Sequence, residues 1–240
     1  MIYFLIPVFN EEDHIPALAR ELTAFPDMAQ KFYVFSDDGS TDGTVRLIAE
    51  YFPSGTFMIL GDGKNYGPGH AFNTGFEWIL QHSSSPDDAV VTMEADGTSD
   101  IGILRDMIQV GRLGYGLVLA SVYAQGGGFD RTSLLRKLVS FAANMLFRLF
   151  FDLKVLTLSS FFRVYSMPVL REIKNRYGGT IIGEPGFISM LEILVKAIRC
   201  KAKIIEIPMK LHSSKRKGKS KMKVMRTGFS YVRFLINPVK

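Results

Sequence analysis

The sequence predicts an α/β protein built around a mostly parallel, doubly wound sheet. Short apolar runs rich in β-branched residues are typical of buried strands, and they recur at residues 2–8, 32–35, 57–60, 90–93 and 117–120. Segments of helical periodicity separate these runs and begin near Glu11, Asp42, Gly69 and Asp100. Because strands that alternate with helices favour parallel pairing through crossovers, we expect helices on both faces of one sheet.

The pattern changes after Ser121. A glycine-rich loop at 126–128, a long helix expected from about Thr132 to Asp152 and a short strand-like piece at 161–165 replace the regular alternation. We therefore expect one globular unit at residues 1–212, with halves at 1–121 and 122–212. Residues 213–240 form a basic, amphipathic C-terminal segment.

The charge of the chain is unevenly distributed. The formal net charge is +6, yet ten Lys and Arg residues and no acidic residue follow Glu206, so the first 206 residues carry a net charge of −4. This asymmetry indicates an anionic partner near the C-terminus, such as a membrane surface or a phosphorylated substrate, unless the segment is simply a solvated tail. No recognisable nucleic-acid motif accompanies the charge, so we expect no nucleic-acid partner.

The sequence offers no candidate membrane span. Its longest clean apolar run is 138–147, which Lys137 and Arg148 flank. The single cysteine, Cys200, and a start without a charged leader predict an intracellular protein.

Polar side chains follow three of the predicted strands at the ends where open α/β sheets bind ligands. They are Asn10 and Glu11, Asp37 and Asp38, and Glu94 and Asp96. Each carboxylate alone could be a helix cap or a turn former. Alternation points Glu94 and Asp96 the same way, however, and a close pair of like charges is costly unless a cation is near. With no His or Cys pattern in competition, these oxygen ligands favour Mg²⁺ or Mn²⁺.

Two further segments carry polar groups that suit phosphate. The loop at 61–75, which includes Asn65 and Gly67, could bring main-chain amides to a phosphate or a base, although it matches no standard phosphate-loop spacing. Arg136 and Ser140 lie four residues apart on the long predicted helix, so they share a face that suits a phosphate monoester. That helix has too many apolar residues for one core-facing stripe, so it lies either in a lipid interface or between protein elements.

Three motifs carry a resemblance to a known family. They are Ile-Pro-Val-Phe-Asn-Glu at 6–11, Ser-Asp-Asp-Gly-Ser-Thr-Asp-Gly-Thr at 36–44, and Asn-Tyr-Gly at 65–67, which leads to Asn-Thr-Gly at 73–75. The chain thus resembles the inverting family 2 glycosyltransferases of GT-A fold, and within them the dolichol-phosphate mannosyltransferase and polyprenyl-phosphate glycosyltransferase branch. The resemblance covers nearly the whole chain.

The resemblance implies a donor site in the first half of the chain. Its expected donor-binding residues are Pro7, Asn10, Glu11, Asp37, Asp38, Asn65, Gly67, Glu94 and Asp96. Glu94 and Asp96 would stand at the family's Asp-x-Asp motif and hold Mg²⁺ or Mn²⁺. Glu94 replaces the usual first aspartate, and Thr98 stands where a glutamine is common.

The second half of the chain resembles the acceptor side of that branch. Tyr123 with Gly126 and Gly127 is similar to a tyrosine-Gly-Gly loop, and residues 216–221 are similar to an Arg-x-x-Gly-x-Ser-Lys segment. Val122 and Phe161 depart from the family's arginine and glycine. The implied acceptor-phosphate contacts are Arg136, Ser140, Arg163, Arg216, Lys219 and Lys221, and the implied catalytic residues are Asp96, Arg136, Ser140 and Arg216.

The resemblance therefore implies metal-dependent, inverting transfer of mannose or glucose from GDP-mannose or a UDP-hexose to a polyprenyl phosphate. The enzyme would work as a peripheral protein on the cytoplasmic face of a membrane, with a membrane-anchoring subunit as one means of attachment. One alternative keeps the donor but uses a glycan or other hydroxyl acceptor, with Glu184 or Glu192 as base. Another is a degenerate, non-catalytic nucleotide-sugar-binding protein, which the departures at Glu94, Thr98 and Val122 motivate.

Overall fold

A computed structural model describes residues 1–26, 29–130, 145, 148, 154–216, 230, 231, 233 and 234. The expected contacts at Arg136, Ser140, Lys219 and Lys221 lie outside these residues. Of the long helix expected at 132–152, only Met145 and Arg148 are described, and both are helical.

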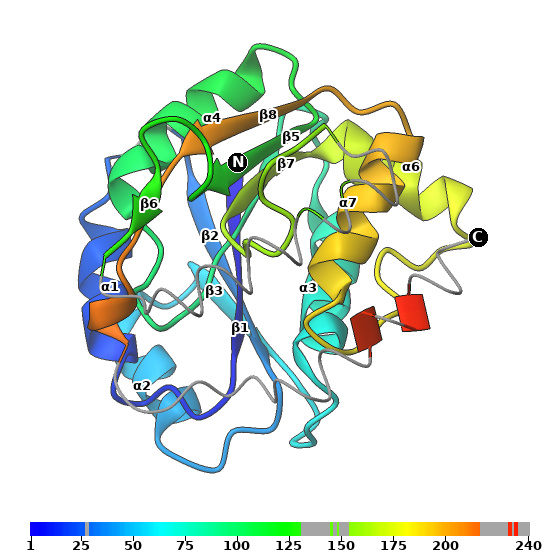
Figure 1. Cartoon of the computed structure of the whole chain (residues 1–240). Helices are drawn as coiled ribbons and strands as arrows, with labels where there is room; N and C mark the ends of the chain where they lie inside the picture. The colour runs from blue at the N-terminus through cyan, green and yellow to red at the C-terminus, as the bar shows by residue number, and fades with distance from the viewer. Residues whose placement is uncertain are drawn as a thin grey trace.

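Within the described residues, seven strands form one sheet in the order β3-β2-β1-β4-β7-β5-β8 (Figure 1). They are β1 (Ile2–Val8), β2 (Lys31–Asp37), β3 (Phe57–Leu60), β4 (Ala89–Thr92), β5 (Leu117–Ser121), β7 (Arg163–Ser166) and β8 (Ile204–Pro208). β7 runs antiparallel to β4 and β5, and the other pairs are parallel. The mostly parallel α/β architecture predicted from the sequence is confirmed.

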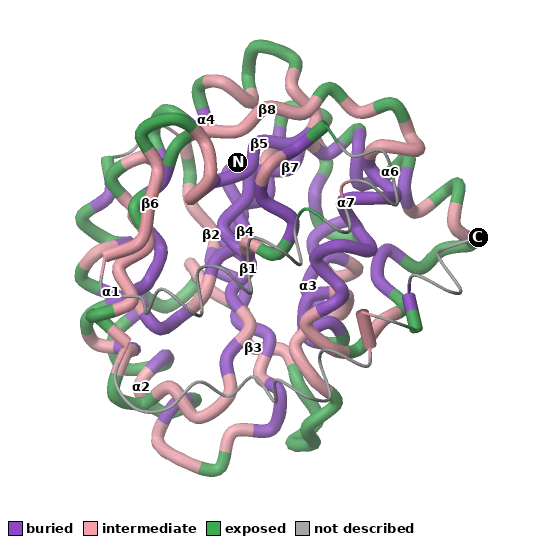
Figure 2. Tube along the Cα trace, in the orientation of Figure 1, coloured by how far each residue is buried: buried purple, intermediate pink, exposed green. Residues whose placement is uncertain are grey.

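Helices cover both faces of this sheet, as alternation along the strands requires. From β1, Phe4 and Ile6 enter one core with residues of α1 (Ile15–Thr23), α2 (Thr44–Tyr51) and α4 (Leu104–Arg112). Tyr3 and Leu5 point to the opposite core, which receives α3 (Pro68–His82), α6 (Met167–Arg176) and α7 (Ser189–Arg199). The buried strands therefore lie between two helical layers (Figure 2).

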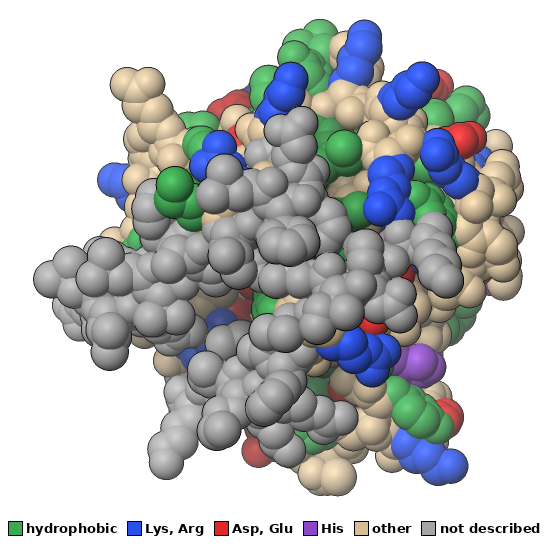
Figure 3. Space-filling view, turned by 45° about the vertical axis from the view of Figure 1, so that its right-hand side comes forward, with side chains coloured by type: hydrophobic (Ala, Val, Ile, Leu, Met, Phe, Trp, Pro, Cys, Tyr) green, Lys and Arg blue, Asp and Glu red, His purple; other side chains and the backbone are tan. Residues whose placement is uncertain are grey.

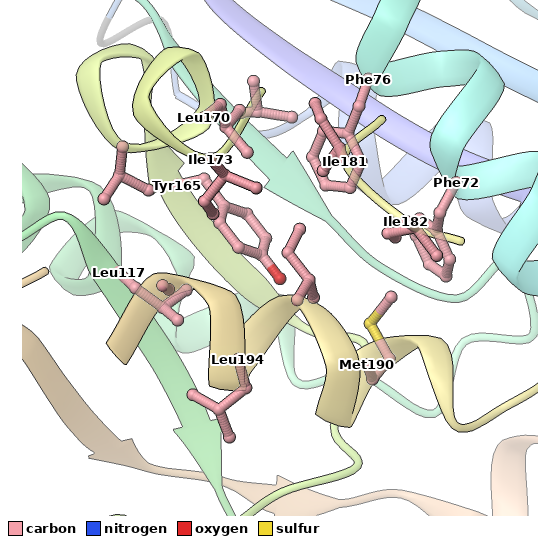
Figure 4. Close-up of a cluster of buried hydrophobic side chains, with 14 of the residues drawn as sticks. Phe72, Phe76, Leu117, Tyr165, Leu170, Ile173, Ile181, Ile182, Met190 and Leu194 are labelled. Carbon is pink, nitrogen blue, oxygen red and sulfur yellow. The ribbon is translucent and has the colours of Figure 1, made fainter. Parts of the chain in front are cut away.

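The second of these cores joins the two halves of the chain. Phe76 of α3 packs edge-on against Tyr165 of β7, with ring centroids 5.4 Å apart, and Met190 and Leu194 of α7 belong to the same cluster (Figure 4). The acceptor half expected at 122–212 thus shares a core with residues of the first half.

The C-terminal part of the chain contributes to the structure at two places. β9 (Lys210–Leu211) pairs in parallel with β6 (Gly128–Phe129) in a separate two-stranded sheet. Further on, Phe234 is buried in the core that contains α3, and Tyr231 packs against it. These two residues of the terminal segment therefore pack against the protein core.

Positive charge is not confined to the C-terminal segment. On the face that Figure 3 shows, Lys and Arg side chains lie over the upper part of the molecule, interspersed with Asp and Glu. Among the residues that the structure describes, no helix combines the length and apolar character needed to cross a membrane.

Candidate active site

The candidate site lies where β1, β2 and β4 end. These strands are neighbours in the sheet and run parallel, and Val8 of β1 is in register with Asp37 of β2. The segments that follow the three strands therefore emerge at the same edge, where doubly wound sheets bind their ligands.

Hydrogen bonds join the segment after β1 to the segment after β2. Asn10 has a positive φ of 53°, and its side-chain oxygen accepts a hydrogen bond from the main-chain N–H of Thr41 at 2.8 Å. The main-chain N–H of Glu11 donates to the Thr44 hydroxyl at 2.7 Å, and the Glu11 carboxylate lies 2.7 Å from Nδ1 of His14. Asn10 and Glu11 thus fix the shape of this edge as well as lining it.

A pocket of about 210 Å³ lies beside the end of β2. Its lining comes from β2, the loop after β3 and the first turns of α3: Ser36, Asp37, Asp38, Gly61, Asp62, Lys64, Tyr66, His70, Ala71 and Thr74. Asp37 and Asp38 were expected here from the sequence. Pro7 is paired with Ser36, so it lies one strand away from this lining.

The Asp38 carboxylate binds the loop whose residues line one side of the pocket. Its carboxylate accepts hydrogen bonds from the main-chain N–H groups of Tyr66, at 2.7 Å, and Gly67, at 3.0 Å. Burial raises the pKa of Asp38, although these two donors oppose the rise. Gly67 has a φ of 102°, and a Cβ there would lie 2.5 Å from the Pro185 carbonyl oxygen, so the turn requires glycine. Asn65 precedes it as an exposed residue of the same loop.

Glu94 and Asp96 follow β4 at the same edge. One Asp96 oxygen, Oδ1, accepts hydrogen bonds from the main-chain N–H of Thr98, at 3.1 Å, and from its hydroxyl, at 2.6 Å. The Glu94 carboxylate accepts a hydrogen bond from the Ser99 hydroxyl at 2.8 Å. Desolvation and the nearby Asp96 charge raise the pKa of Glu94 to about 7.

This pair fits a Mg²⁺ or Mn²⁺ ion that is shared with a substrate. No group of three or more His, Cys, Asp or Glu side chains gathers for a metal within the described ranges. Mg²⁺ is commonly held by one or two carboxylates together with substrate phosphates, so two acids suffice when a diphosphate supplies the remaining oxygens. Thr98, a departure from the family pattern, orients Asp96. An Asp followed two residues later by Thr is the sequence signal for that contact.

Arg216 contacts Asp96, one member of this pair. Its Nη2 and Nε are 2.5 Å and 2.6 Å from Oδ2 of Asp96, the oxygen that Thr98 does not use. The sequence placed Arg216 among acceptor-phosphate contacts, and the structure brings it to the expected metal ligands from 120 positions away in the chain.

Arg163 needs a correction. It has 0% exposure, and its guanidinium donates to the main-chain oxygens of Ser160, Leu158 and Met190 at 2.7, 2.7 and 2.8 Å. A buried arginine requires such partners, and these three oxygens satisfy N–H groups of the guanidinium inside the protein. Arg163 therefore ties the segment before β7 to α7 and is not placed to contact an acceptor phosphate.

The two candidate general bases differ in their surroundings. Glu192 is 3% exposed, and its carboxylate accepts hydrogen bonds from Gly183 N–H at 2.9 Å and Glu184 N–H at 2.7 Å. Its role is structural. Glu184 is partly exposed, with Oε1 3.5 Å from Nη2 of Arg233.

The sequence indicated the loop at 61–75 but not which of its side chains line the pocket. Asp62 and Lys64 line it from the loop after β3, and the His70 ring lies 4.6 Å from the Tyr66 ring, as expected of a histidine that packs. The only signal for Asp62 and Lys64 is their position after a predicted strand, which does not separate lining residues from solvated loop residues.

Solved structures share the fold described above. Glucosyl-3-phosphoglycerate synthase from Mycobacterium tuberculosis, in complex with Mn²⁺, UDP-glucose and glycerol 3-phosphate, matches with a TM-score of 0.64 at 16% identity, over 98% of this chain and 77% of that one. TarS residues 1–349 of S. aureus match with a TM-score of 0.61 at 17% identity, over 98% and 64%. The class of fold is thus that of GT-A glycosyltransferases.

The chain belongs to glycosyl transferase family 2, whose family model matches residues 3–174. It is 27% identical over 222 residues to the undecaprenyl-phosphate mannosyltransferase of Micrococcus luteus, and the aligned region covers 91% of this chain and 86% of that protein. It is 24% identical over 247 residues to the dolichol-phosphate mannosyltransferase of Pyrococcus furiosus, over 98% of this chain and 63% of that protein.

Proposed function

We propose that this glycosyltransferase is metal-dependent and transfers mannose or glucose, with inversion, from a nucleotide diphosphate donor to a polyprenyl or dolichyl phosphate. The observation that carries the proposal is the pair of carboxylates, Glu94 and Asp96, at the sheet edge that also holds the pocket beside β2. Two relatives named for undecaprenyl phosphate and dolichol phosphate support the acceptor class. The reaction would take place at the cytoplasmic face of a membrane, where a peripheral protein meets its lipid.

The donor would bind across the ends of β1, β2 and β4. GDP-mannose and a UDP-hexose both suit this site, since the pocket offers carboxylates and main-chain groups to either base. The proposed donor contacts are Pro7, Asn10, Glu11, Asp37, Asp38, Asn65, Gly67, Glu94 and Asp96.

A Mg²⁺ or Mn²⁺ ion held by Glu94 and Asp96 would neutralise the charge of the donor diphosphate. An acceptor phosphate oxygen then attacks the anomeric carbon from the face opposite the nucleotide. The bond from that carbon to the diphosphate oxygen breaks, and the nucleotide diphosphate leaves with the electron pair. Because a phosphate is already anionic near neutral pH, no strong general base is required.

The proposed acceptor-phosphate contacts are basic or hydroxyl side chains that can hold phosphate oxygens. They are Arg136, Ser140, Arg216, Lys219 and Lys221. Burial removes Arg163 from this set.

One observation favours a second candidate function, transfer to a hydroxyl of a glycan. Glu184 is a partly exposed carboxylate, and its main-chain oxygen lies 2.0 Å from the place of a Cβ on Gly69, at the start of α3. A partly exposed carboxylate on the segment that contacts the start of α3 could act as the general base that a hydroxyl acceptor needs. Acceptor dependence separates the two functions.

The test measures transfer of radiolabelled sugar from GDP-mannose and from UDP-glucose, with Mg²⁺ or Mn²⁺, with and without polyprenyl phosphate. We expect polyprenyl-phosphate-dependent label in the chloroform phase, reduced by Asp96→Asn at least about 100-fold, as for loss of one group that stabilises transition-state charge. Asp87→Asn, which changes an exposed carboxylate, is the matched control and should retain activity. Full activity of Asp96→Asn would refute the metal role, and donor binding without transfer to any acceptor would favour a binding-only protein.

A further inference from the structure

The Asp96 carboxylate is fully occupied by groups of this chain. Thr98 donates twice to Oδ1, and two nitrogens of the Arg216 guanidinium converge on Oδ2 at 2.5 and 2.6 Å. Asp96 is buried and Arg216 is about one-third exposed, so this is a short charge-assisted contact with limited solvent access. A positive group therefore already lies at the oxygen that faces the C-terminal segment.

Several contacts carry Arg216 to this position, and none of them involves Asp96. β9 pairs with β6, and the main-chain N–H of His212 donates to the Thr98 carbonyl at 3.0 Å. The Ser214 hydroxyl donates to Asp130 at 2.5 Å, and Lys215 Nζ lies 3.1 Å from Oε1 of Glu21. The strap formed by residues 210–216 is thus fixed on its own, and Arg216 reaches Asp96 with little loss of conformational freedom.

We infer that Arg216 and a divalent cation bind Oδ2 of Asp96 in competition, so that metal binding releases Arg216 from Asp96. This inference rests on the metal site of the proposed function and adds its regulation. Coordination requires direct contact between the cation and a carboxylate oxygen, and the guanidinium occupies that oxygen. Two cations at one oxygen also repel each other, which makes joint occupancy unfavourable.

The competition gives Arg216 two successive partners. Without metal, it neutralises Asp96 beside Glu94 and so reduces the repulsion between the two acids. Once released, its planar guanidinium is free to hold phosphate oxygens at the same edge of the sheet. Because coupling between two ligands is reciprocal, the contact that keeps Arg216 on Asp96 must weaken metal binding by the same factor.

The test measures Mn²⁺ affinity in the absence of donor and acceptor, with free Mn²⁺ quantified by its electron paramagnetic resonance signal. Arg216→Gln should bind Mn²⁺ about 10-fold more tightly than the wild-type protein, within the range usual for coupled ligands. Lys210→Gln is the matched control because it removes an exposed positive charge from the same strap, whose pairing with β6 is made by the main chain, and its affinity should change by less than about 2-fold. Unchanged or weaker binding by Arg216→Gln, or an equal gain in both variants, would overturn the inference.

A second measurement uses the wild-type chain and does not depend on how the variant folds. Phenylglyoxal modifies accessible arginines, and the rate at Arg216 is read by peptide mass spectrometry with and without Mn²⁺. We expect Mn²⁺ to accelerate modification of Arg216, and an unchanged or slower rate would contradict release. Both measurements omit the substrates, so they can fail while sugar transfer is observed, or succeed while no transfer to polyprenyl phosphate occurs.

Discussion

Nζ of Lys196 lies 2.7 Å from Oε1 of Glu192 in the interior of the molecule, and both side chains are 5% exposed. Lys196 also donates to the Ile181 carbonyl at 2.8 Å, while Glu192 accepts from the main chain at Gly183. The pair therefore fixes the segment before α7. Through a hydrogen bond from Gly69 N–H to Pro185 O at 2.7 Å, that segment supports the start of α3 beside the donor pocket.

Replacing Glu192 with Ala should destabilise the protein strongly. The change leaves Lys196 buried without its carboxylate and leaves two main-chain donors without an acceptor, so we expect a loss of about 3–5 kcal/mol in the free energy of unfolding. Glu50→Ala is the control, since its pair with Arg46 is exposed and should contribute less than about 1 kcal/mol. Urea unfolding of both variants tests this, and equal effects would argue against a structural role for Glu192.

The contact between α3 and β1 leaves no room for a side chain at Gly75. A Cβ on Gly75 would lie 2.0 Å from Cδ1 of Leu5, which is fully buried. We predict that Gly75→Ala lowers the free energy of unfolding by about 1–3 kcal/mol through overpacking. Gly186→Ala is the control, because its new Cβ would have no heavy atom within 4 Å. Its free energy of unfolding, measured by thermal melts, should change by no more than about 0.5 kcal/mol. A neutral Gly75→Ala would contradict this packing.

Removing the Asp38 carboxylate should weaken donor binding more than stability. Asp38→Ala leaves the N–H groups of Tyr66 and Gly67 without their acceptor, so the loop that lines the pocket loses its shape. We expect the Kd for GDP or UDP to rise about 10-fold or more, measured by titration calorimetry. Asp87→Ala, a change at an exposed carboxylate, should leave the Kd unchanged. Unaltered binding by Asp38→Ala would remove Asp38 from the donor site.

Asp42 makes the free energy of unfolding depend on pH in the acidic range. Burial opposes its ionisation, but hydrogen bonds from Thr44 and from Glu12 N–H prevail and lower the pKa of Asp42 below 3.8. A carboxyl with a lowered folded-state pKa stabilises the protein above its unfolded-state pKa, and this contribution is lost as pH falls through the folded-state value. The difference in unfolding free energy between the wild-type protein and Asp42→Asn should be constant above about pH 5 and shrink below about pH 4. Urea unfolding across this range checks it, and a difference that grows on acidification would contradict the assignment.

The central strands and the strand-end carboxylates could be predicted from the sequence because both depend on local patterns. β1 and β5 are almost uninterrupted apolar runs, which few other structures explain. β8 was missed because it lies at the sheet edge, is only partly buried and carries Glu206 in its centre. Helix starts differed by one to four residues; α1, for example, begins at Ile15 after a turn that follows Glu11.

The partners of charged side chains could not be predicted because they depend on tertiary contacts. Arg163 looks like a surface arginine in the sequence, and only the fold shows its donors enclosed by main-chain oxygens. Likewise, nothing in the local pattern around Arg216 indicates Asp96, which the strap brings near through pairing of β9 with β6. Identifying a residue type at a site was therefore easier than identifying what it touches.

The most direct test of the proposed function asks whether the acceptor phosphate is the nucleophile. Labelled GDP-mannose or UDP-glucose would be incubated with the enzyme and Mn²⁺, together with polyprenyl phosphate in one reaction and polyprenol of the same chain length in another. The proposal predicts chloroform-extractable label with polyprenyl phosphate and none above background with polyprenol. Equal label in the two reactions, or label only in a glycan acceptor, would contradict it.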